Sequence, residues 1–222
     1  QTDLIHANVE GLNLDDQIRS TLEKLHSAAK GDRWKIAAGL PAVAFGLLRG
    51  RDVATSIQPY LQRAFIPVSP ESGQFLYVTA LAANARAIVE FGTSYGISTL
   101  YLAAAAKETG GYVIGSEIET EKLETARANM ERAGVGDVVD IRGGDALESL
   151  RDVPHGIDFL LLDGWKDLYL PVLDLLGPKL AHGAIVVADN IFTFKAALRP
   201  YVERMQAPNS GFSSITLPIG EG

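Results

Sequence analysis

Five short apolar runs in the second half of the sequence each end at, or close to, an acidic residue, and these acids are the first candidates for chemistry. They are Glu90, Glu117, Asp145, Asp163 and Asp189. A single acid after a strand is often a helix cap. Because the carboxyl ends of parallel strands meet at one edge of a sheet, where ligands bind in open α/β folds, five such acids predict a polar ligand site.

The last two runs supply three oxygen donors that could hold a metal. Asp163, Asp189 and Asn190 carry the carboxylate and amide oxygens that suit Mg²⁺, Mn²⁺ or Ca²⁺, with coordination positions left for water or substrate. The chain has no cysteine, so any metal must be held by oxygen or imidazole. The alternative interpretation is that Asp189 and Asn190 begin a turn or cap a helix.

Lys166 follows Asp163 by three residues and could reach the same pocket. A divalent cation nearby would disfavour its ammonium form, which is the condition under which a lysine acts as a base. The ordinary alternative is a solvated surface lysine, and without the neighbouring acids we would prefer that interpretation of Lys166.

A glycine-rich turn follows the first apolar run and leads into a predicted helix. It reads E-F-G-T-S-Y-G from Glu90 to Gly96, unlike the G-x-G-x-x-G of dinucleotide sites. Its backbone N–H groups would face a ligand, although tight turns also need glycine for conformational reasons. Glu117 is placed to accept from the hydroxyls of a ribose, and Asp145 from the amine of an adenine. Nicotinamide cofactors also contain ribose, so the pattern leaves the cofactor open.

Short apolar strands and helices alternate after residue 85, and these elements must position the candidate residues. The strand runs are continuously apolar, as expected when both faces of a parallel sheet are covered. The predicted strands are Ala87–Glu90, Tyr112–Glu117, Val138–Arg142, Ile157–Asp163, Ala184–Asp189 and a last one at Phe212–Leu217. The predicted helices are Ser98–Lys107, Thr120–Ala133, Ala146–Arg151 and Tyr169–Lys179. This alternation predicts an α/β fold with an open, mostly parallel, doubly wound sheet.

Residues 1–84 are expected to form a helical N-terminal extension. The apolar residues Ile18, Leu22, Leu25 and Ala29 share one face of a helix from about Asp15. Ser69-Pro70 is a typical helix start, and residues 36–49 form an apolar stretch rich in Ala and Gly. We therefore predict a single domain over residues 1–222, with the α/β core at 85–222.

Composition excludes several classes of protein. The chain has 222 residues, of which 47% are hydrophobic, and a formal net charge of −7. The apolar fraction is too high for a disordered chain, and the negative charge argues against sequence-independent binding to nucleic acid. The most apolar early stretch, Ile36–Leu48, has about 13 residues, short of the roughly 20 that span a membrane. We expect a cytoplasmic protein without nucleic-acid or membrane partners.

Six stretches resemble the class I S-adenosylmethionine-dependent O-methyltransferases of the cation-dependent group, which includes catechol and caffeoyl-CoA O-methyltransferases. The stretches run in order from residue 69 to 191 and read SPESGQFL, VEFGTSYGISTLYLA, GSEIE, GGDALESL, LLLDGWKDLYLPVLDLL and VVADNI. The glycine-rich turn marks only the broad methyltransferase class. The run D-G-W-K-D-L-Y-L-P with a downstream A-D-N is more specific and is similar to the site of the catechol enzyme.

The resemblance implies S-adenosylmethionine as the cofactor. The glycine-rich turn and Ser98 would hold its methionine part, with Glu90 near the amino group. Glu117 would bind the ribose hydroxyls, while Ile118 and Ala146 flank the adenine. The implied cofactor contacts are Glu90, Gly92, Thr93, Ser94, Gly96, Ser98, Glu117, Ile118, Asp145, Ala146 and Asp163.

The resemblance also implies a mechanism. Asp163, Asp189 and Asn190 would bind Mg²⁺ (or Mn²⁺ or Ca²⁺), Lys166 would be the general base, and Trp165 an apolar wall beside cofactor and substrate. The implied activity is cation-dependent transfer of a methyl group to a hydroxyl of a small catechol-like, ortho-dihydroxy aromatic substrate by a homodimer. The alternatives are a nicotinamide-dependent oxidoreductase on a similar sheet and a non-catalytic S-adenosylmethionine-binding protein.

Three departures from the resemblance stand out. Gly164 lies where the catechol enzyme has His, and the caffeoyl-CoA enzymes carry a different residue at the position of Trp165. Family members continue past a P-I-G-[DE]-G turn into a final strand, whereas this sequence stops at Gly222 within that turn, so we expect a truncated chain with an incomplete sheet edge.

Overall fold

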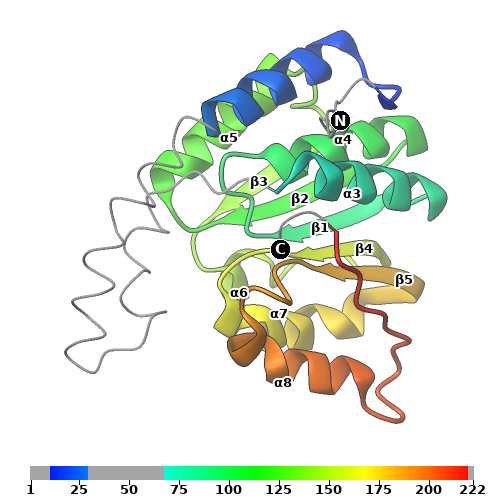
Figure 1. Cartoon of the computed structure of the whole chain (residues 1–222). Coiled ribbons are helices and arrows are strands. Elements are labelled where there is room, and N and C mark those ends of the chain that lie inside the picture. Colours follow the sequence, from blue (N-terminus) through cyan, green and yellow to red (C-terminus); the bar gives the residue numbers. More distant parts are fainter. Residues whose placement is uncertain (1–10, 30–67, 220–222) are drawn as a thin grey trace, which may run out of the picture.

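A computed structural model describes residues 11–29 and 68–219, and a parallel sheet lies at the centre of this part of the chain (Figure 1). The sheet has the order β3-β2-β1-β4-β5, and every neighbouring pair is parallel. Its strands are β1 (Ala87–Phe91), β2 (Tyr112–Glu117), β3 (Val139–Gly143), β4 (Ile157–Leu162) and β5 (Leu180–Ala188). The predicted open parallel α/β sheet is confirmed.

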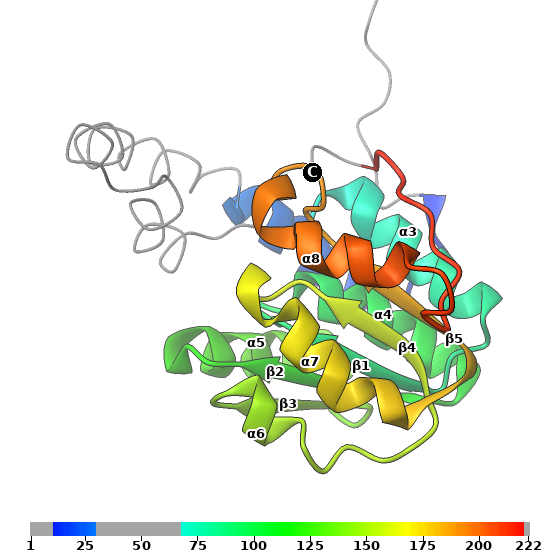
Figure 2. The same cartoon turned by 90° about the horizontal axis from the view of Figure 1, so that it is seen from below.

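Helices cover both faces of the sheet (Figures 1 and 2). One face carries the helix of residues 16–29 with α3 (Pro70–Ala82), α4 (Ile97–Thr109) and α5 (Thr120–Arg132). The other carries α6 (Ala146–Ser149), α7 (Tyr169–Leu176) and α8 (Lys195–Gln206). Short 3₁₀ turns, η2 (Lys166–Leu168) and η3 (Gly177–Lys179), flank α7.

Strands β1, β2, β4 and β5 each contribute side chains to two hydrophobic cores, which explains their apolar sequences, whereas the edge strand β3 contributes only Val139 and Ile141, to the core under α4. In β1, Ile88 belongs to the core under α4, whereas Val89 belongs to the core under α7. Helix α4 is buried from Ile97 to Ala106 because α3 and the helix of residues 16–29 contribute to the same core above it.

The described part of the N-terminal region agrees with the sequence. Ile18, Leu22 and Ala29 are buried on the helix of residues 16–29. Ser69 caps α3, because its Oγ accepts a hydrogen bond from Ser72 N at 3.1 Å. The apolar stretch expected at residues 36–49 lies outside the described residues. No helix within residues 11–29 and 68–219 is long and apolar enough to cross a membrane.

The strand predicted at Phe212–Leu217 is wrong. That segment pairs with no strand among the described residues, and it lies against the end of α8 instead: Ser214 Oγ, like Ser210 Oγ just before the segment, donates to Met205 O at 3.4 Å. A run of β-favouring residues forms a strand only where a partner edge is available.

Two further elements differ from the sequence-based expectation. Strand β5 begins at Leu180 rather than Ala184, and Leu180 already pairs with Ile157 of β4. The register with β4 shifts after this pair, and Gly183, at φ +81°, lies in the shifted part. Helix α8 was not predicted, although Leu198, Tyr201 and Met205 are buried at helical spacing.

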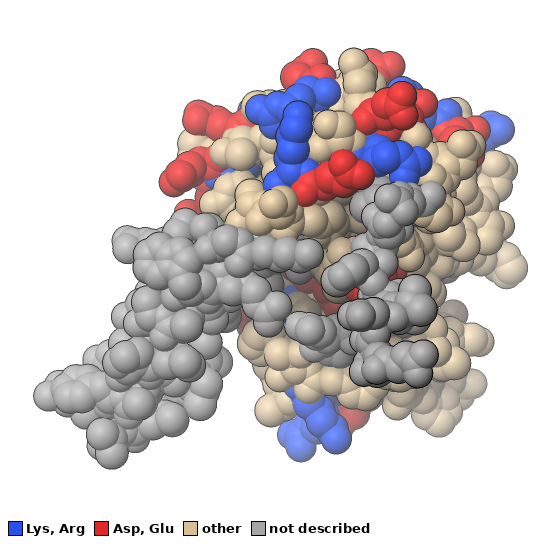
Figure 3. All heavy atoms as spheres, turned by 45° about the horizontal axis from the view of Figure 1, so that its top comes forward, with Lys and Arg blue, Asp and Glu red and all other residues tan. Residues whose placement is uncertain are grey.

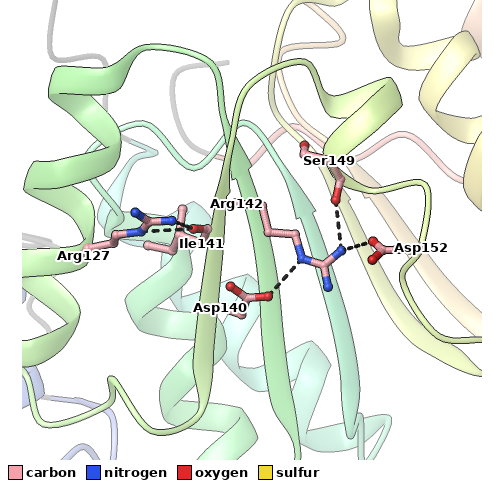
Figure 4. A network of polar contacts seen from close by, with 6 residues as sticks. All are labelled: Arg127, Asp140, Ile141, Arg142, Ser149 and Asp152. Atoms are coloured by element: carbon pink, nitrogen blue, oxygen red, sulfur yellow. Dashed lines mark hydrogen bonds and ion pairs between the residues drawn. The ribbon is translucent and has the colours of Figure 1, made fainter.

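The edge strand β3 is fastened by two arginines (Figure 4). Arg127 of α5 donates from Nε and Nη2 to Ile141 O at 3.1 and 2.6 Å. Arg142 donates to Asp140 at 2.9 Å and to Asp152 at 2.5 Å. These contacts cover part of β3, whose outer edge has no partner strand among the described residues.

On the face shown in Figure 3, acidic and basic side chains are interspersed.

Candidate functional site

Backbone hydrogen bonds bring four strand ends to one edge of the sheet. Gly92 N donates to Ser116 O at 3.2 Å, and Asp163 N donates to Phe91 O at 2.8 Å. Asp189 N in turn donates to Leu162 O at 3.0 Å. The glycine-rich turn and the loops that begin with Asp163 and Asp189 are therefore adjacent, as the sequence predicted for acids at the ends of parallel strands.

Glu90 is a fully buried carboxylate at the end of β1. Ser98 Oγ donates to its Oε1 at 2.5 Å, while Thr93 Oγ1 and Thr99 Oγ1 donate to its Oε2 at 2.9 and 2.5 Å. Burial raises the pKa of Glu90, the three hydroxyl hydrogen bonds oppose that shift, and the charge of Glu117 adds to it. The site therefore holds a buried acid that a bound cationic group would stabilise.

The glycine-rich turn needs its glycines for two reasons. Gly92 has φ +98° and Gly96 has φ +88°, in the region that favours glycine. A Cβ on Gly92 would also lie 2.5 Å from Gly164 N, so the loop after β4 leaves no room for a side chain there. Ser94, at φ +49°, holds the turn open between them. Gly96 is the residue before α4, whose N-terminal N–H groups face this edge.

Glu117 at the end of β2 connects the glycine-rich turn to the loop that follows β2. Its Oε2 accepts a hydrogen bond from Ser94 N at 2.7 Å, and its Oε1 accepts one from Glu119 N at 2.8 Å. Each carboxylate oxygen has a second lone pair that can accept a further donor. The structure thus fixes this side chain beside the turn, where the sequence placed a ribose-binding acid.

The residues expected around an adenine lie at the ends of β2 and β3. Ile118 is 54% exposed, which is unusual for isoleucine, and Ala146 is buried at the start of α6. Asp145 caps α6, because its Oδ1 accepts from Leu147 N at 2.9 Å. The capping role that is common for strand-end acids is therefore present at Asp145.

Asp163 and Asp189 form an acidic pair at the ends of β4 and β5. Burial raises the pKa of Asp163 to about 7, Lys166 counteracts this shift, and the charges of Asp189 and Glu90 add to it. Two partly buried carboxylates that repel each other are unfavourable unless positive charge lies nearby, and among the described residues Lys166 supplies such a charge.

Asn190 completes the predicted oxygen donor set. It has φ +63°, a conformation that asparagine tolerates better than most residues, and its N–H donates to Asp189 Oδ1 at 2.6 Å. Among the described residues no group of three or more Asp, Glu, His or Cys side chains is arranged to hold a metal. The predicted set contains two carboxylates and one amide, and hard oxygen donors of this kind fit Mg²⁺ or a similar ion.

Lys166 points into the site rather than into solvent, with only 14% of its side chain exposed. Its Nζ lies 3.4 Å from Asp163 Oδ1 and donates to Tyr169 Oη at 2.8 Å. The same Nζ lies 5.0 Å from the ring centroid of Tyr169 and 5.7 Å from that of Phe194. Trp165 is half-buried just before η2.

Sequence reasoning missed three features of this site. Thr99 contributes one of the hydrogen bonds to Glu90, and its only signal was its place next to Ser98. Tyr169 was interpreted as the start of a packed helix, which it is, but its hydroxyl also contacts Lys166. A Cβ on Gly164 would overlap the ring of Phe91, so the packing of this chain has no room for the histidine of the catechol enzyme.

Known proteins share this fold and parts of this sequence. The chain matches the methyltransferase domain family over residues 89–191. Catechol O-methyltransferase from Mycobacterium tuberculosis is 35% identical over 127 residues, which are 57% of each chain. Caffeoyl-CoA O-methyltransferase 2 from Zea mays is 30% identical over 178 residues, 69% of this chain and 67% of that protein.

A solved structure similar to this chain is also an O-methyltransferase. The O-methyltransferase from Bacillus cereus, in complex with SAH, has a TM-score of 0.65 at 26% identity over 90% of this chain and 83% of that one. The chain spans less than two thirds of the length of the bacterial catechol O-methyltransferases that it matches, 57% and 58%.

Proposed function

The chain belongs to the family of S-adenosylmethionine-dependent O-methyltransferases that includes the catechol and caffeoyl-CoA enzymes, and from this premise we propose that it methylates a hydroxyl of a small ortho-dihydroxy aromatic substrate with the help of a divalent cation. The methyl donor would be S-adenosylmethionine. The observation that carries the proposal is the acidic pair Asp163 and Asp189 with Lys166 beside it, next to the glycine-rich turn.

The described residues fit the cofactor. Glu90 is a buried acid held by hydroxyl groups, and the cationic amino group of a bound methionine moiety would pair with it. Glu117 retains lone pairs for the hydroxyls of a ribose. Ile118 offers an exposed apolar side chain to an adenine ring, opposite Ala146. When bound, S-adenosylmethionine supplies an electrophilic methyl group on sulfur.

The donor set fits a divalent cation for an electrostatic reason. Asp163, Asp189 and Asn190 would hold the ion, whose charge would offset the repulsion within the acidic pair. An ion held there supplies Lewis acidity, which lowers the pKa of a chelated phenol from about 10 and disfavours the ammonium form of a nearby lysine.

Lys166 would then perform the proton transfer. Its Nζ would accept the proton of the hydroxyl that attacks. The transfer would form a bond between that oxygen and the methyl carbon and break the bond between this carbon and sulfur, which would leave with the electron pair as a neutral thioether. Most of the rate would come from holding the two reactants in line, which requires fixed strand ends rather than a covalent group on the protein.

A methyl-transfer assay tests the proposal. Catechols, hydroxycinnamoyl thioesters and flavonoids are offered with labelled S-adenosylmethionine, with and without Mg²⁺. We expect methylation of a substrate with two vicinal hydroxyls and none of the analogue with one. Binding of NAD without any methyl transfer would instead favour the oxidoreductase alternative, and binding of S-adenosylmethionine without turnover the non-catalytic one.

The remaining expectations belong to the same proposal. One domain over residues 1–222 would act in the cytoplasm, with a small aromatic substrate and without nucleic-acid or membrane partners. A homodimer is proposed from the family likeness, and light scattering of the purified protein would test it.

A further inference from the structure

Tyr169 is the first residue of α7, and its ring is fixed on two sides. It is fully buried, and it makes edge-to-face contacts with Phe91 at 6.3 Å and with Tyr201 at 5.7 Å between ring centroids. Phe91 ends β1 and Tyr201 lies on α8, so strand and helix both hold the ring in place. Such contacts restrict an aromatic ring more than burial alone.

The hydroxyl of Tyr169 connects two parts of the candidate site. It accepts a hydrogen bond from Lys166 Nζ at 2.8 Å and donates one to Asp189 O at 3.2 Å. A buried hydroxyl is expected to be hydrogen-bonded, and here both partners belong to the site. The loop after β5 and the lysine of η2 are thereby connected through one oxygen atom.

Lys166 has a long side chain with many rotamers, and the surrounding groups limit it to few. Asp163 and Tyr169 accept two of its hydrogen bonds, and the ring centroid of Phe194 lies 5.7 Å from its Nζ, at cation–π distance. Of these contacts, the Tyr169 hydrogen bond is the shortest, 2.8 Å against 3.4 Å to Asp163.

We propose that Tyr169 is a positioning residue, which holds the Nζ of Lys166 at the place where it takes the proton of the substrate and ties that place to the loop of Asp189. This inference rests on the proposed function for the role of Lys166. The contact itself, at 2.8 Å between Lys166 Nζ and Tyr169 Oη, is independent of that assignment. Tyr169 acts through Lys166 and touches no reacting atom.

The test compares Tyr169→Phe with Tyr201→Phe. The first variant keeps the ring and its edge contacts but removes the hydroxyl that Lys166 contacts. The second removes a buried hydroxyl of the same aromatic cluster that is not bonded to Lys166. In Tyr169→Phe we expect kcat to fall about tenfold, the loss typical of a hydrogen bond to a charged group, with unchanged KM for S-adenosylmethionine and substrate. Tyr201→Phe should keep the wild-type kcat.

Crystal structures of the wild type and Tyr169→Phe give a second readout that needs no activity. We expect the Lys166 side chain to leave its position, or to occupy several, in the variant only. An unmoved Lys166 together with an unchanged kcat would overturn the positioning role, and so would equal losses of kcat in both variants. If the wild type has no methyl transfer at all, the proposed function fails, and the position of Lys166 alone then decides whether Tyr169 holds it.

Discussion

Gly92 and Gly164 lie in backbone contact: a Cβ placed on Gly92 would be 2.5 Å from Gly164 N and 2.6 Å from Gly164 Cα. The first belongs to the turn after β1 and the second to the loop after β4. The two loops that would contact cofactor and substrate therefore pack on each other directly, and a side chain at this point would separate them.

Gly92→Ala should lower both stability and affinity for S-adenosylmethionine. The variant carries the cost of a positive φ, about 1–3 kcal/mol for a strained residue, and must also move the loop after β4. Gly156→Ala is the matched control, because Gly156 has φ +90° but nothing within 4 Å of an added Cβ. Urea unfolding and calorimetric binding of the cofactor measure both effects. Equal destabilisation of the two variants would show that the contact between Gly92 and Gly164 is unimportant.

Glu90→Gln should change the pH dependence of stability in the cofactor-free protein. Burial raises the pKa of Glu90 in the folded state, whereas the unfolded chain titrates near 4.3. Glu90 thus contributes most below that pH, and its contribution is lost as pH rises through the folded-state pKa. As pH rises through this range, the wild type should therefore lose stability relative to Glu90→Gln, as measured by the free energy of unfolding of each protein.

The same variant should bind S-adenosylmethionine roughly tenfold to a hundredfold more weakly, because a charge-assisted contact with the amino group is lost. Glu124→Gln, at an exposed position of α5, is the control and should change neither quantity. A pH-independent stability difference, or unchanged affinity, would be evidence against the assigned environment of Glu90.

Lys166→Met should lower kcat about a hundredfold or more and leave the dissociation constant of S-adenosylmethionine within about twofold. Met has an apolar, unbranched side chain of similar length but cannot accept a proton. Lys24→Met, at an exposed position of the helix of residues 16–29, is the control. Single-turnover rates and equilibrium binding distinguish the two quantities, and wild-type turnover in Lys166→Met would remove Lys166 as the base.

The sequence predicted the sheet well because most of its strands are buried on both faces and read as continuous apolar runs, with the edge strand β3 as the exception. Their carboxyl ends lie at adjacent positions, so acids such as Glu90 and Asp163 could be placed together before any coordinates. The strand at Phe212–Leu217 failed because residue types that favour strands do not reveal whether a partner edge exists. Helix α8 was missed although Leu198, Tyr201 and Met205 have helical spacing, since Pro200 lies within it and argues against a helix.

The site was less accessible to sequence reasoning where it depends on side-chain packing. The contact of Tyr169 with Lys166 follows from a 3₁₀ turn that leads directly into α7, and residue type alone does not show it. The overlap that a side chain on Gly164 would make with Phe91 is likewise a property of packed loops. Asp145, by contrast, has a role that residue type and position did indicate, because it caps α6, as isolated strand-end acids often do.

Methyl transfer to catechol by metal-stripped protein shows whether the reaction depends on a divalent cation. Initial rates are measured in chelator and across a Mg²⁺ titration for the wild type, Asp189→Asn and the control Asp174→Asn, which changes an exposed acid of α7. We predict no transfer in chelator, full recovery with Mg²⁺, and at least about a tenfold higher Mg²⁺ requirement in Asp189→Asn alone, since a charged ligand is lost. Undiminished transfer by the wild type in chelator would contradict the account.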